Sequence, residues 1–385
     1  MAGTDFVCLR HVNDDALASR VREFIDDETT CDLCQAAGAV AIDVITNVVR
    51  TAIYERFKPA QDWNAPWDEI ESGEESRVYD LGELLDGELG LFDAVDEDLY
   101  EAIDASFGSD TMWVTTFEYD MRPRDKDVLG WSEFRSLVQH KSRYLQLDEQ
   151  SFVAKMYGVP SPRGMLHRVA ALVDRHQLYR TIGTDQLLWR GRVDDRRRPK
   201  WGPAELASAP ARFARQSRMS AAGISMFYGA LDVDTVAAEL AGDARRWLMA
   251  GAFRAARSLR VIDLTELPPF PSPFAERAAR RDDELLFLRE FCDDVSRPVL
   301  EPELVHVEYA PTQVVTEYLR YAFVPRRRKR PVDGIVYQSS RCKGVCVALF
   351  ATHEQCLGGA ERERLLRWAG RRLVVRPHPP GACPD

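Results

Sequence analysis

The sequence lacks the short motifs that mark the common nucleotide-binding and hydrolytic folds. No Gly-x-Gly-x-x-Gly follows a predicted strand and no Gly-Lys-Ser/Thr loop is present, which argues against a Rossmann dehydrogenase and a P-loop NTPase. Gly-x-Ser-x-Gly is missing, and His353-Glu354 continues as Gln-Cys rather than completing His-Glu-x-x-His. These absences argue against an α/β-hydrolase and a zinc metalloprotease.

Long apolar runs are also missing. The longest, residues 36–49, contains Asp43 and is too short to span a bilayer. The first residues carry no basic start followed by an apolar run, as a secretory signal would. We therefore expect a cytoplasmic protein with no membrane association. Its 385 residues, 45% hydrophobic and 29% charged, have the balance of a globular protein and suffice for two ordinary domains.

Charge is unevenly distributed along the chain, whose formal net charge is −10. Residues 1–150 hold 13 Lys and Arg against 34 Asp and Glu, whereas residues 151–385 hold 38 against 27. This split suggests two modules with different partners, the first repelling nucleic acid and the second attracting an anion. The basic runs at 195–200 and 325–331 are typical of solvated loops that help to attract such an anion. Direct binding of DNA or RNA is not expected.

Two pairs of potential metal ligands stand near the N-terminus. Cys8 and His11 are separated by two residues, and so are Cys31 and Cys34. Two such short knuckles supply four ligands to one tetrahedral ion, which predicts a structural zinc site. The alternative is a pair of half-buried cysteines beside an unrelated surface histidine. A second apparent cluster is interrupted by a buried strand and is interpreted as core cysteines; it comprises Cys342, Cys346, His353 and Cys356.

Hydrophobic periodicity predicts an α+β protein whose first part is mainly helical. Helices are expected at 13–26, 36–56, 81–86, 96–106, 131–144, 165–176, 232–241, 275–296 and 312–323. Strands are expected at 187–192, 226–231, 248–255, 259–265, 334–340 and 344–350. The Pro/Gly break at 159–164 indicates a boundary. We expect an N-terminal zinc-binding domain over 1–148 and a second domain over 165–375.

Four blocks of the second half, taken together, resemble the RES domain family over roughly residues 180–355. They are LLWRGR (187–192), SRMSAAGISMFYGALDVDTVAAEL (217–240), YAPTQVVTEYLR (309–320), and VDGIVYQSSR with GVCVALF (332–350). The family is named for an Arg, a Glu and a Ser, and its members cleave NAD⁺. The resemblance implies a fold similar to the ADP-ribosyltransferase toxins, a split β-core with flanking helices.

The resemblance assigns candidate site residues one by one. Arg190 matches the family arginine, Glu239 the glutamate and Ser339 the serine, although the doublet leaves Ser340 open. Three further residues are expected to bind the substrate, namely Arg218 as a second basic group, Tyr228 as the aromatic before the helix, and Ser220. Shorter members carry a glycine-arginine-aromatic-asparagine run where this chain has SRMSAAGIS, and Ser220 is the expected substitute for that asparagine.

What the resemblance implies is an NAD⁺-degrading toxin or antiviral effector. Glu239 is expected to stabilise an oxocarbenium-like transition state, with Arg190 and Arg218 clamping the pyrophosphate. The nucleophile is either inorganic phosphate, giving ADP-ribose-1″-phosphate, or water, giving ADP-ribose. The alternatives are an ADP-ribosyltransferase that modifies a macromolecule, and an interaction protein whose RES cleft is inactive.

The N-terminal part is similar to a module found fused to RES and HEPN domains in bacterial defence proteins, over roughly residues 1–145. The resemblance rests on VCLRHVNDD, CDLC and WSEFRSLVQHKSRY. It implies a structural zinc and an acidic surface that binds a protein antitoxin or senses a trigger. Arg135 and His140 match the spacing of HEPN ribonucleases, a pairing that also arises by chance. A homo-oligomer is compatible with the sequence, although no heptad pattern supports one.

Overall fold

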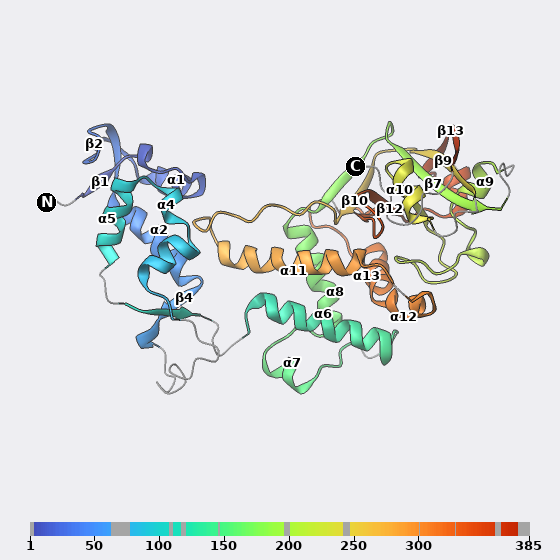
Figure 1. The fold of residues 1–385 in the computed structure, drawn as a ribbon, viewed down its shortest axis with the longest axis horizontal. Coiled ribbons are helices and arrows are strands. Elements are labelled where there is room, and N and C mark those ends of the chain that lie inside the picture. Colours follow the sequence, from blue (N-terminus) through green and yellow to red (C-terminus); the bar gives the residue numbers. More distant parts are fainter. Residues whose placement is uncertain are drawn as a thin grey trace. The chain divides into compact units, whose positions relative to one another are not determined.

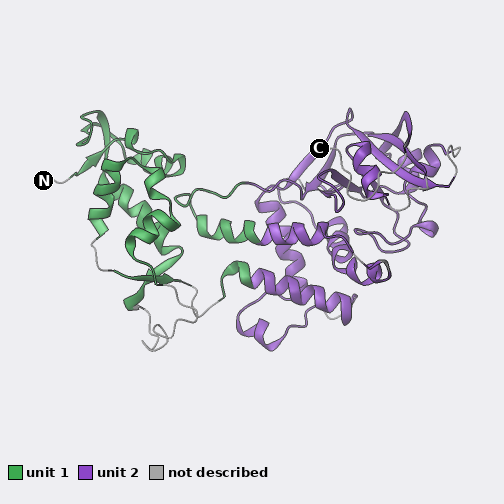
Figure 2. Ribbon diagram, in the orientation of Figure 1, with its two compact units in different colours: residues 1–125, 269–286 green, residues 126–268, 287–385 purple. Residues whose placement is uncertain are grey.

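The computed structural model describes residues 4–62, 78–107, 111–116, 121–144, 147–195, 201–241, 247–299, 301–327, 329–358 and 363–375. The chain divides into two compact units (Figure 2). Unit 1 comprises residues 1–125 and 269–286, and unit 2 comprises residues 126–268 and 287–385. Both units therefore consist of two separate stretches of chain. The units differ from the expected domains of residues 1–148 and 165–375, and those limits stay a prediction.

Unit 1 combines short helices with two small sheets (Figure 1). Strands β1 (Phe6–Val7), β3 (Ala37–Ala41) and β2 (Asp26–Thr30) form an antiparallel sheet in that order, and β4 (Phe57–Pro59) pairs with β5 (Trp113–Thr115). Its helices are α1 (Asp15–Val21), α2 (Ile42–Tyr54), α4 (Leu91–Ala94) and α5 (Glu97–Phe107), with 3-10 turns η1 (Leu9–His11), η2 (Arg22–Phe24) and η3 (Ala60–Asp62) and the π-helical turn η4 (Glu83–Glu88).

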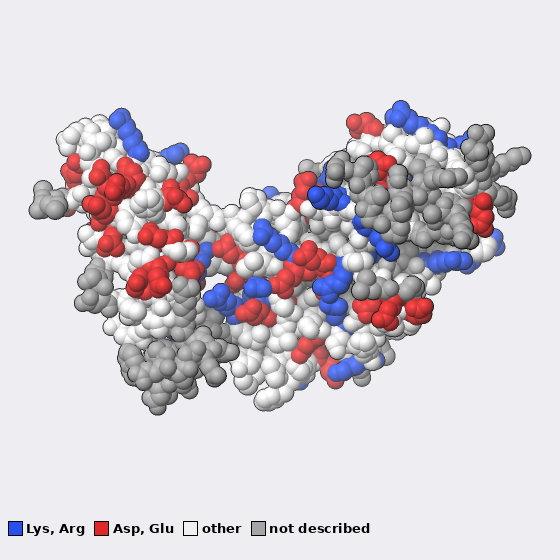
Figure 3. Space-filling model, in the orientation of Figure 1, with Lys and Arg blue, Asp and Glu red and all other residues white. Residues whose placement is uncertain are grey.

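The core of unit 1 includes a residue from the distant stretch 269–286. Phe274 is buried within a cluster otherwise formed by residues 7–113. The Arg20 guanidinium donates to the Phe274 carbonyl at 3.2 Å, and Arg56 pairs with Asp282 at 2.6 Å. These contacts hold the second stretch within the unit. Figure 3 shows Asp and Glu side chains spread over the visible face of unit 1 with few Lys and Arg among them.

The helix expected over residues 36–56 was wrong in its first part. Residues 37–41 form strand β3, and helix α2 begins only at Ile42. Gly38 adopts a φ of +82°, which a right-handed helix does not allow. Strand β3 also pairs on both sides, with β1 and with β2, so tertiary pairing outweighs the local helical pattern.

Unit 2 is built on a mixed eight-stranded sheet with flanking helices, in agreement with the expected α+β class. Its order is β13-β9-β7-β8-β12-β11-β10-β6, and only β10 and β11 are parallel. The strands are β6 (Tyr179–Ile182), β7 (Leu187–Asp194), β8 (Phe227–Ala230), β9 (Trp247–Ala255), β10 (Leu259–Asp263), β11 (Gly334–Gln338), β12 (Val345–Leu349) and β13 (Leu366–Val375).

The helices of this part of the chain reproduce most of the expected ones. They are α6 (Pro123–His140), α7 (Phe152–Met156), α8 (Pro162–Arg175), α9 (Pro203–Leu206), α10 (Val233–Glu239), α11 (Ala278–Ser296), α12 (Val305–Glu308), α13 (Ala310–Tyr321) and α14 (His353–Leu357), with 3-10 turns η5 (Ala211–Phe213) and η6 (Pro302–Leu304). The unit limits fall inside α6 and α11. No helix among the described residues is both long and apolar enough to cross a membrane.

The sheet of unit 2 is nearly divided between β7 and β8. These strands are joined by a single residue pair, Trp189 with Ala230, whereas β7 pairs with β9 along its whole length. Gly229 makes the contact possible, because a Cβ there would lie 2.6 Å from the Trp189 carbonyl oxygen. The two halves of the sheet therefore diverge beside this junction.

Candidate functional site

A cavity of about 460 Å³ opens at the junction between β7 and β8 within unit 2. Five of the residues expected from the sequence line it directly, and a sixth, Ser339, is hydrogen-bonded to one of them. The lining residues come from β7, β8, α10, the β11–β12 hairpin and the segments around 217 and 298; among them are Arg190, Arg218, Tyr228, Glu239, Tyr309, Tyr337, Ser340, Arg341 and Cys346. The divergence of the two half-sheets creates the space that these side chains enclose.

Glu239, the last residue of α10, is held by the turn that follows β11. The Ser339 hydroxyl donates a short hydrogen bond to Glu239 Oε1, and the Ser340 amide donates to the same oxygen at 3.1 Å. Ser339 Oγ in turn accepts the amides of Arg341 at 3.1 Å and Cys342 at 3.3 Å. The serine doublet thus contributes a buried side chain from Ser339 and a backbone N–H from Ser340.

Arg190 brings a half-buried positive charge to the cavity. Its Nη1 donates to the Tyr228 carbonyl at 3.3 Å and its guanidinium lies 5.4 Å from the Phe227 ring centre. Among the described residues its Nε is buried without a hydrogen-bond partner. Burial, followed by the neighbouring Arg192, lowers the pKa of Arg190 to about 10, which leaves it charged at neutral pH. A half-buried cation with no ion-pair partner in the described part of the chain favours an anionic ligand.

Arg218 is more firmly tied to the protein than the sequence suggested. Its Nη1 donates to the carbonyls of Val295 and Arg297, each at 2.7 Å, at the end of helix α11. Its guanidinium lies 5.0 Å from the ring centre of Tyr309, another lining residue. Such a side chain caps a helix C-terminus and also presents charge to the cavity.

Tyr228 lines the cavity, and Ser220 lies behind it as a hydrogen-bond partner of its hydroxyl. The Tyr228 hydroxyl donates to Ser220 Oγ at 2.9 Å and accepts the Met219 amide at 3.2 Å. Burial raises the pKa of Tyr228 to about 12. Ser220 is fully buried and is not part of the cavity wall, so the structure connects it to the ligand space only through Tyr228.

Several lining residues were not singled out from the sequence as site residues. Tyr337 and Cys346 are directly paired across β11 and β12 and both face the cavity. Burial and the nearby Glu239 carboxylate raise the pKa of the Cys346 thiol. Tyr309 precedes α13, and Arg341 follows the serine doublet. The sequence around Tyr337 is that of a core residue. Only its pairing with Cys346 on the neighbouring strand could have indicated that it lines a cavity.

Arg135 and His140 do not form a pair in the structure. The Arg135 guanidinium binds Asp294 at 2.8 Å, an aspartate that also accepts the Trp131 indole N–H at 2.8 Å. His140 is exposed at the end of α6. A separation of five residues also sets the two side chains on different faces of an α-helix. The ribonuclease hypothesis finds no support in this geometry.

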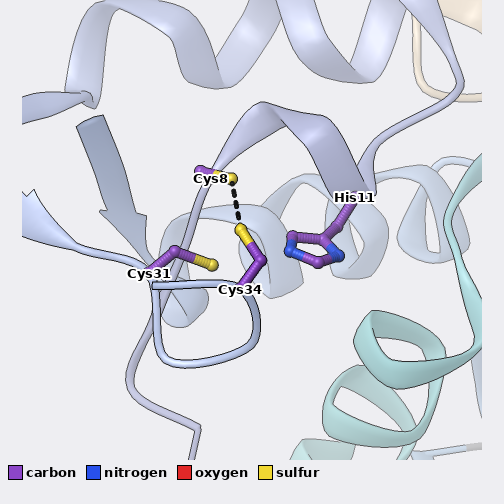
Figure 4. A group of neighbouring side chains, drawn as sticks. All are labelled: Cys8, His11, Cys31 and Cys34. Carbon is purple, nitrogen blue, oxygen red and sulfur yellow. Dashed lines mark hydrogen bonds between the residues drawn. The ribbon is translucent and has the colours of Figure 1, made fainter. Parts of the chain in front are cut away.

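The N-terminal cysteines and histidine come together in unit 1, as the spacing predicted (Figure 4). One ligand atom from each of Cys8, His11, Cys31 and Cys34 lies within 4.8 Å of all the others. The Cys8 and Cys34 sulfur atoms are 3.5 Å apart, close to the roughly 3.8 Å between thiolates that bind one tetrahedral zinc at about 2.3 Å.

The surroundings of these side chains also suit a metal. His11 Nδ1 makes a short hydrogen bond to Asp96, and the buried Nε2 has no partner among the described residues. A carboxylate behind a histidine is the usual arrangement in zinc sites. Burial raises the pKa of Cys8 to about 11, whereas the Ala36 amide and then His11 lower that of Cys34 to about 7. The four side chains fit a zinc ion.

The second apparent cysteine cluster is not a metal-binding group in the described part of the chain. Cys346 and Cys356 are buried, and Cys342 is half-buried. The Cys356 sulfur lies 3.2 Å from the Ser208 hydroxyl, which donates to the Ala351 carbonyl at 2.8 Å. The basic run at 195–200 lies outside the described residues beyond Asp195.

Comparison with known proteins identifies both parts of the chain. Residues 25–152 match the model of HEPN/RES N-terminal domain 1, and residues 187–368 match that of the RES domain. The crystal structure of the M. tuberculosis MbcT–MbcA toxin–antitoxin complex contains a chain with 14% sequence identity, covering 55% of this chain and 93% of that one, at a TM-score of 0.28. No curated protein matches the sequence. The chain thus carries a HEPN/RES N-terminal domain 1 ahead of a RES domain.

Proposed function

We propose that the RES domain of this protein cleaves NAD⁺ at the bond between nicotinamide and ribose. The observation that carries the proposal is the pairing of Glu239 with Ser339 beside a cavity lined by Arg190 and Arg218. A fixed carboxylate and two cationic side chains that line one cavity suit a substrate with a positively charged reacting centre and an anionic pyrophosphate. The resemblance of this chain to NAD⁺-cleaving RES proteins supports the same substrate.

Glu239 is the proposed catalytic residue. Cleavage breaks the ribose C1″–N bond, and its electron pair leaves with nicotinamide, which departs as a neutral molecule and needs no general acid. The positive charge that develops on the ribose ring is stabilised by a fixed carboxylate, as in glycoside cleavage. Hydrogen bonds from Ser339 and Ser340 converge on Oε1, which fixes the carboxylate before the substrate arrives.

The remaining lining residues bind and orient the dinucleotide. Arg190, with its buried and unpartnered Nε, is the proposed main ligand of the pyrophosphate. Arg218 contributes charge from a fixed position. Tyr228 forms an aromatic wall for nicotinamide or ribose, and Ser220 holds its hydroxyl in place. Arginine suits the binding of a pyrophosphate better than lysine does, because its planar guanidinium can donate two parallel hydrogen bonds.

The nucleophile is proposed to be inorganic phosphate or water. Phosphate attack at ribose C1″ gives ADP-ribose-1″-phosphate, whereas water gives ADP-ribose and a proton. The divided sheet beside the cavity resembles the split β-core of ADP-ribosyltransferase toxins. Transfer of ADP-ribose to a macromolecule is therefore the alternative reaction, and an inactive cleft is the alternative without chemistry.

In the cell we propose that this reaction makes the protein a cytoplasmic toxin or antiviral effector, because NAD⁺ loss stops growth. The acidic N-terminal part is the proposed binding surface for a protein antitoxin or trigger. We also propose that Cys8, His11, Cys31 and Cys34 hold one structural zinc ion. Zinc there would tie η1 to the turn between β2 and β3 and supplies no chemistry to the RES cavity. We also propose that the chain can form a homo-oligomer.

The test is nicotinamide release from NAD⁺ by the purified full chain, with and without phosphate. We expect release by the wild type and a loss of about a hundredfold or more in Glu239→Gln, the magnitude typical for removing a transition-state charge contact. Glu354→Gln, an exposed glutamate in α14, is the matched control and should remain active. Radiolabelled ADP-ribose found on protein or nucleic acid would favour the transferase instead. Absence of release under every condition would contradict the proposal.

A further inference from the structure

Helix α10 crosses the divided sheet and carries Glu239 at its end. The position of the helix on the sheet therefore sets the position of the Glu239 carboxylate. On one side it packs on β7, where a Cβ at Gly191 would lie 2.5 Å from Val236 Cγ1. On the other side it meets the β11–β12 hairpin, where a Cβ at Gly344 would lie 1.8 Å from Thr235 Oγ1. Both contacts are to β-branched side chains of α10, and the contact with the hairpin is the shorter.

Thr235 cannot move aside at the hairpin contact. It is buried, and its hydroxyl donates to Asp232 at 2.7 Å while the Asp232 side chain also accepts its amide at 2.7 Å. A Cβ at Gly344 would further lie 2.8 Å from Thr235 Cβ and 2.9 Å from its Cγ2. Contacts under about 3.0 Å to a branched side chain whose hydroxyl is hydrogen-bonded are relieved by moving the helix and the turn apart.

Gly344 also closes the turn that holds Ser339. Its carbonyl accepts the Ser339 amide at 2.9 Å and the Gln338 side-chain amide at 3.1 Å. Thr235 and Glu239 are four residues apart and therefore lie on the same face of α10. The Thr235–Gly344 contact and the Glu239–Ser339 hydrogen bond thus join the same helix face to the same turn, one helical turn apart.

We propose that Thr235 and Gly344 are positioning residues, which set Glu239 at hydrogen-bonding distance from Ser339 by letting α10 rest directly on the hairpin backbone. This inference rests on the proposed function for its catalytic meaning. Its geometric content does not depend on the reaction: helix α10 approaches the turn so closely that only glycine fits at position 344.

The experiment compares Gly344→Ala with Gly334→Ala in the full chain. Gly334 lies at the opposite end of β11, and a Cβ there would meet the Ala348 carbonyl oxygen at 2.4 Å, so it strains the same hairpin away from α10. We expect kcat for nicotinamide release to fall about a hundredfold in Gly344→Ala, as for a displacement of about 1 Å. KM should change less than kcat. Gly334→Ala should lower thermal stability and leave kcat near that of the wild type.

A second readout does not depend on catalysis. Hydrogen–deuterium exchange reports the amides of Ser340, Arg341 and Cys342, which donate to Glu239 and Ser339. We expect them to exchange faster in Gly344→Ala and to stay protected in Gly334→Ala. The double variant Gly344→Ala/Thr235→Ala removes the two contacts made by Oγ1 and Cγ2 and should recover part of both kcat and protection.

The outcomes separate the inference from the proposed function. A wild type that releases no nicotinamide contradicts the proposed function, while the exchange data still test the contact between Thr235 and Gly344. Unchanged protection and kcat in Gly344→Ala overturn the inference. So does an equal loss of kcat in Gly334→Ala, because the effect would then be general weakening of the hairpin. Absence of any recovery in the double variant also overturns it, since Thr235 would not be the group that blocks the added methyl.

Discussion

The Ser339 hydroxyl donates a hydrogen bond to Glu239 across 100 residues of sequence. The same oxygen of Glu239 accepts the backbone amide of Ser340. The two serines are adjacent in the chain and have the same chemistry, yet one contributes its side chain and the other its backbone. This difference resolves the doublet into two distinct roles and makes them separable by mutation.

Ser339→Ala is therefore expected to reduce nicotinamide release, and Ser340→Ala is expected to leave it largely intact. The first variant removes a hydrogen bond to a charged group, worth about 1.5–3 kcal/mol, which corresponds to a loss of roughly tenfold to a hundredfold in kcat. The second keeps the amide that Glu239 uses. Steady-state kinetics of both variants test this, and a larger loss in Ser340→Ala would reverse the assignment.

The two arginines are expected to respond differently to substitution by glutamine. Arg190→Gln removes a half-buried cation whose buried Nε has no partner among the described residues, so NAD⁺ affinity should fall about tenfold or more without loss of thermal stability. Arg218→Gln removes the hydrogen bonds to the Val295 and Arg297 carbonyls and should lower stability by about 1–3 kcal/mol. Binding and thermal unfolding measured on both variants decide this. Equal destabilisation by both would contradict it.

The purified protein is expected to contain about one zinc ion per chain, held by three thiolates and one histidine. Cys31→Ala, at a buried ligand position, should lose the metal and lower the unfolding temperature of the chain. Cys292→Ala, a buried cysteine of α11, is the control and should retain zinc. Elemental analysis with thermal unfolding before and after chelation tests the prediction. A metal-free wild type insensitive to Cys31→Ala would show that the four side chains form no metal site.

Asp283 is expected to weaken the protein at neutral pH. Burial raises its pKa to about 6, with Arg122 opposing the shift. Because the unfolded carboxyl ionises near pH 3.9, the folded state binds more protons between about pH 4 and pH 6, and stability falls as pH rises through that window. Asp283→Asn should therefore raise the unfolding temperature at about pH 7.5 and have little effect below about pH 4. A destabilised variant at neutral pH would contradict the sign.

Local sequence patterns predicted most elements of unit 2, because each strand and helix there carries its own periodicity. Glu239 and Ser339 were assigned by the resemblance to the RES family, because a glutamate at a helix end or a serine after a strand carries no local signal of its own. The tie between Arg218 and the end of α11 was not predictable, since it joins residues 77 or more positions apart and has no local signal. Strand β3 was missed for a related reason: its partners on both sides, not its own residues, make it a strand.

The inclusion of residues 269–286 in unit 1 has a consequence for how the protein is made. Phe274 completes a core whose other members come from residues 7–113, so a ribosome must synthesise the first half of unit 2 before unit 1 can close. The nascent N-terminal part therefore stays open for the time needed to add residues 126–268, about 7–30 s at about 5–20 residues per second. A partner that binds during translation would meet unit 1 while its core is still incomplete.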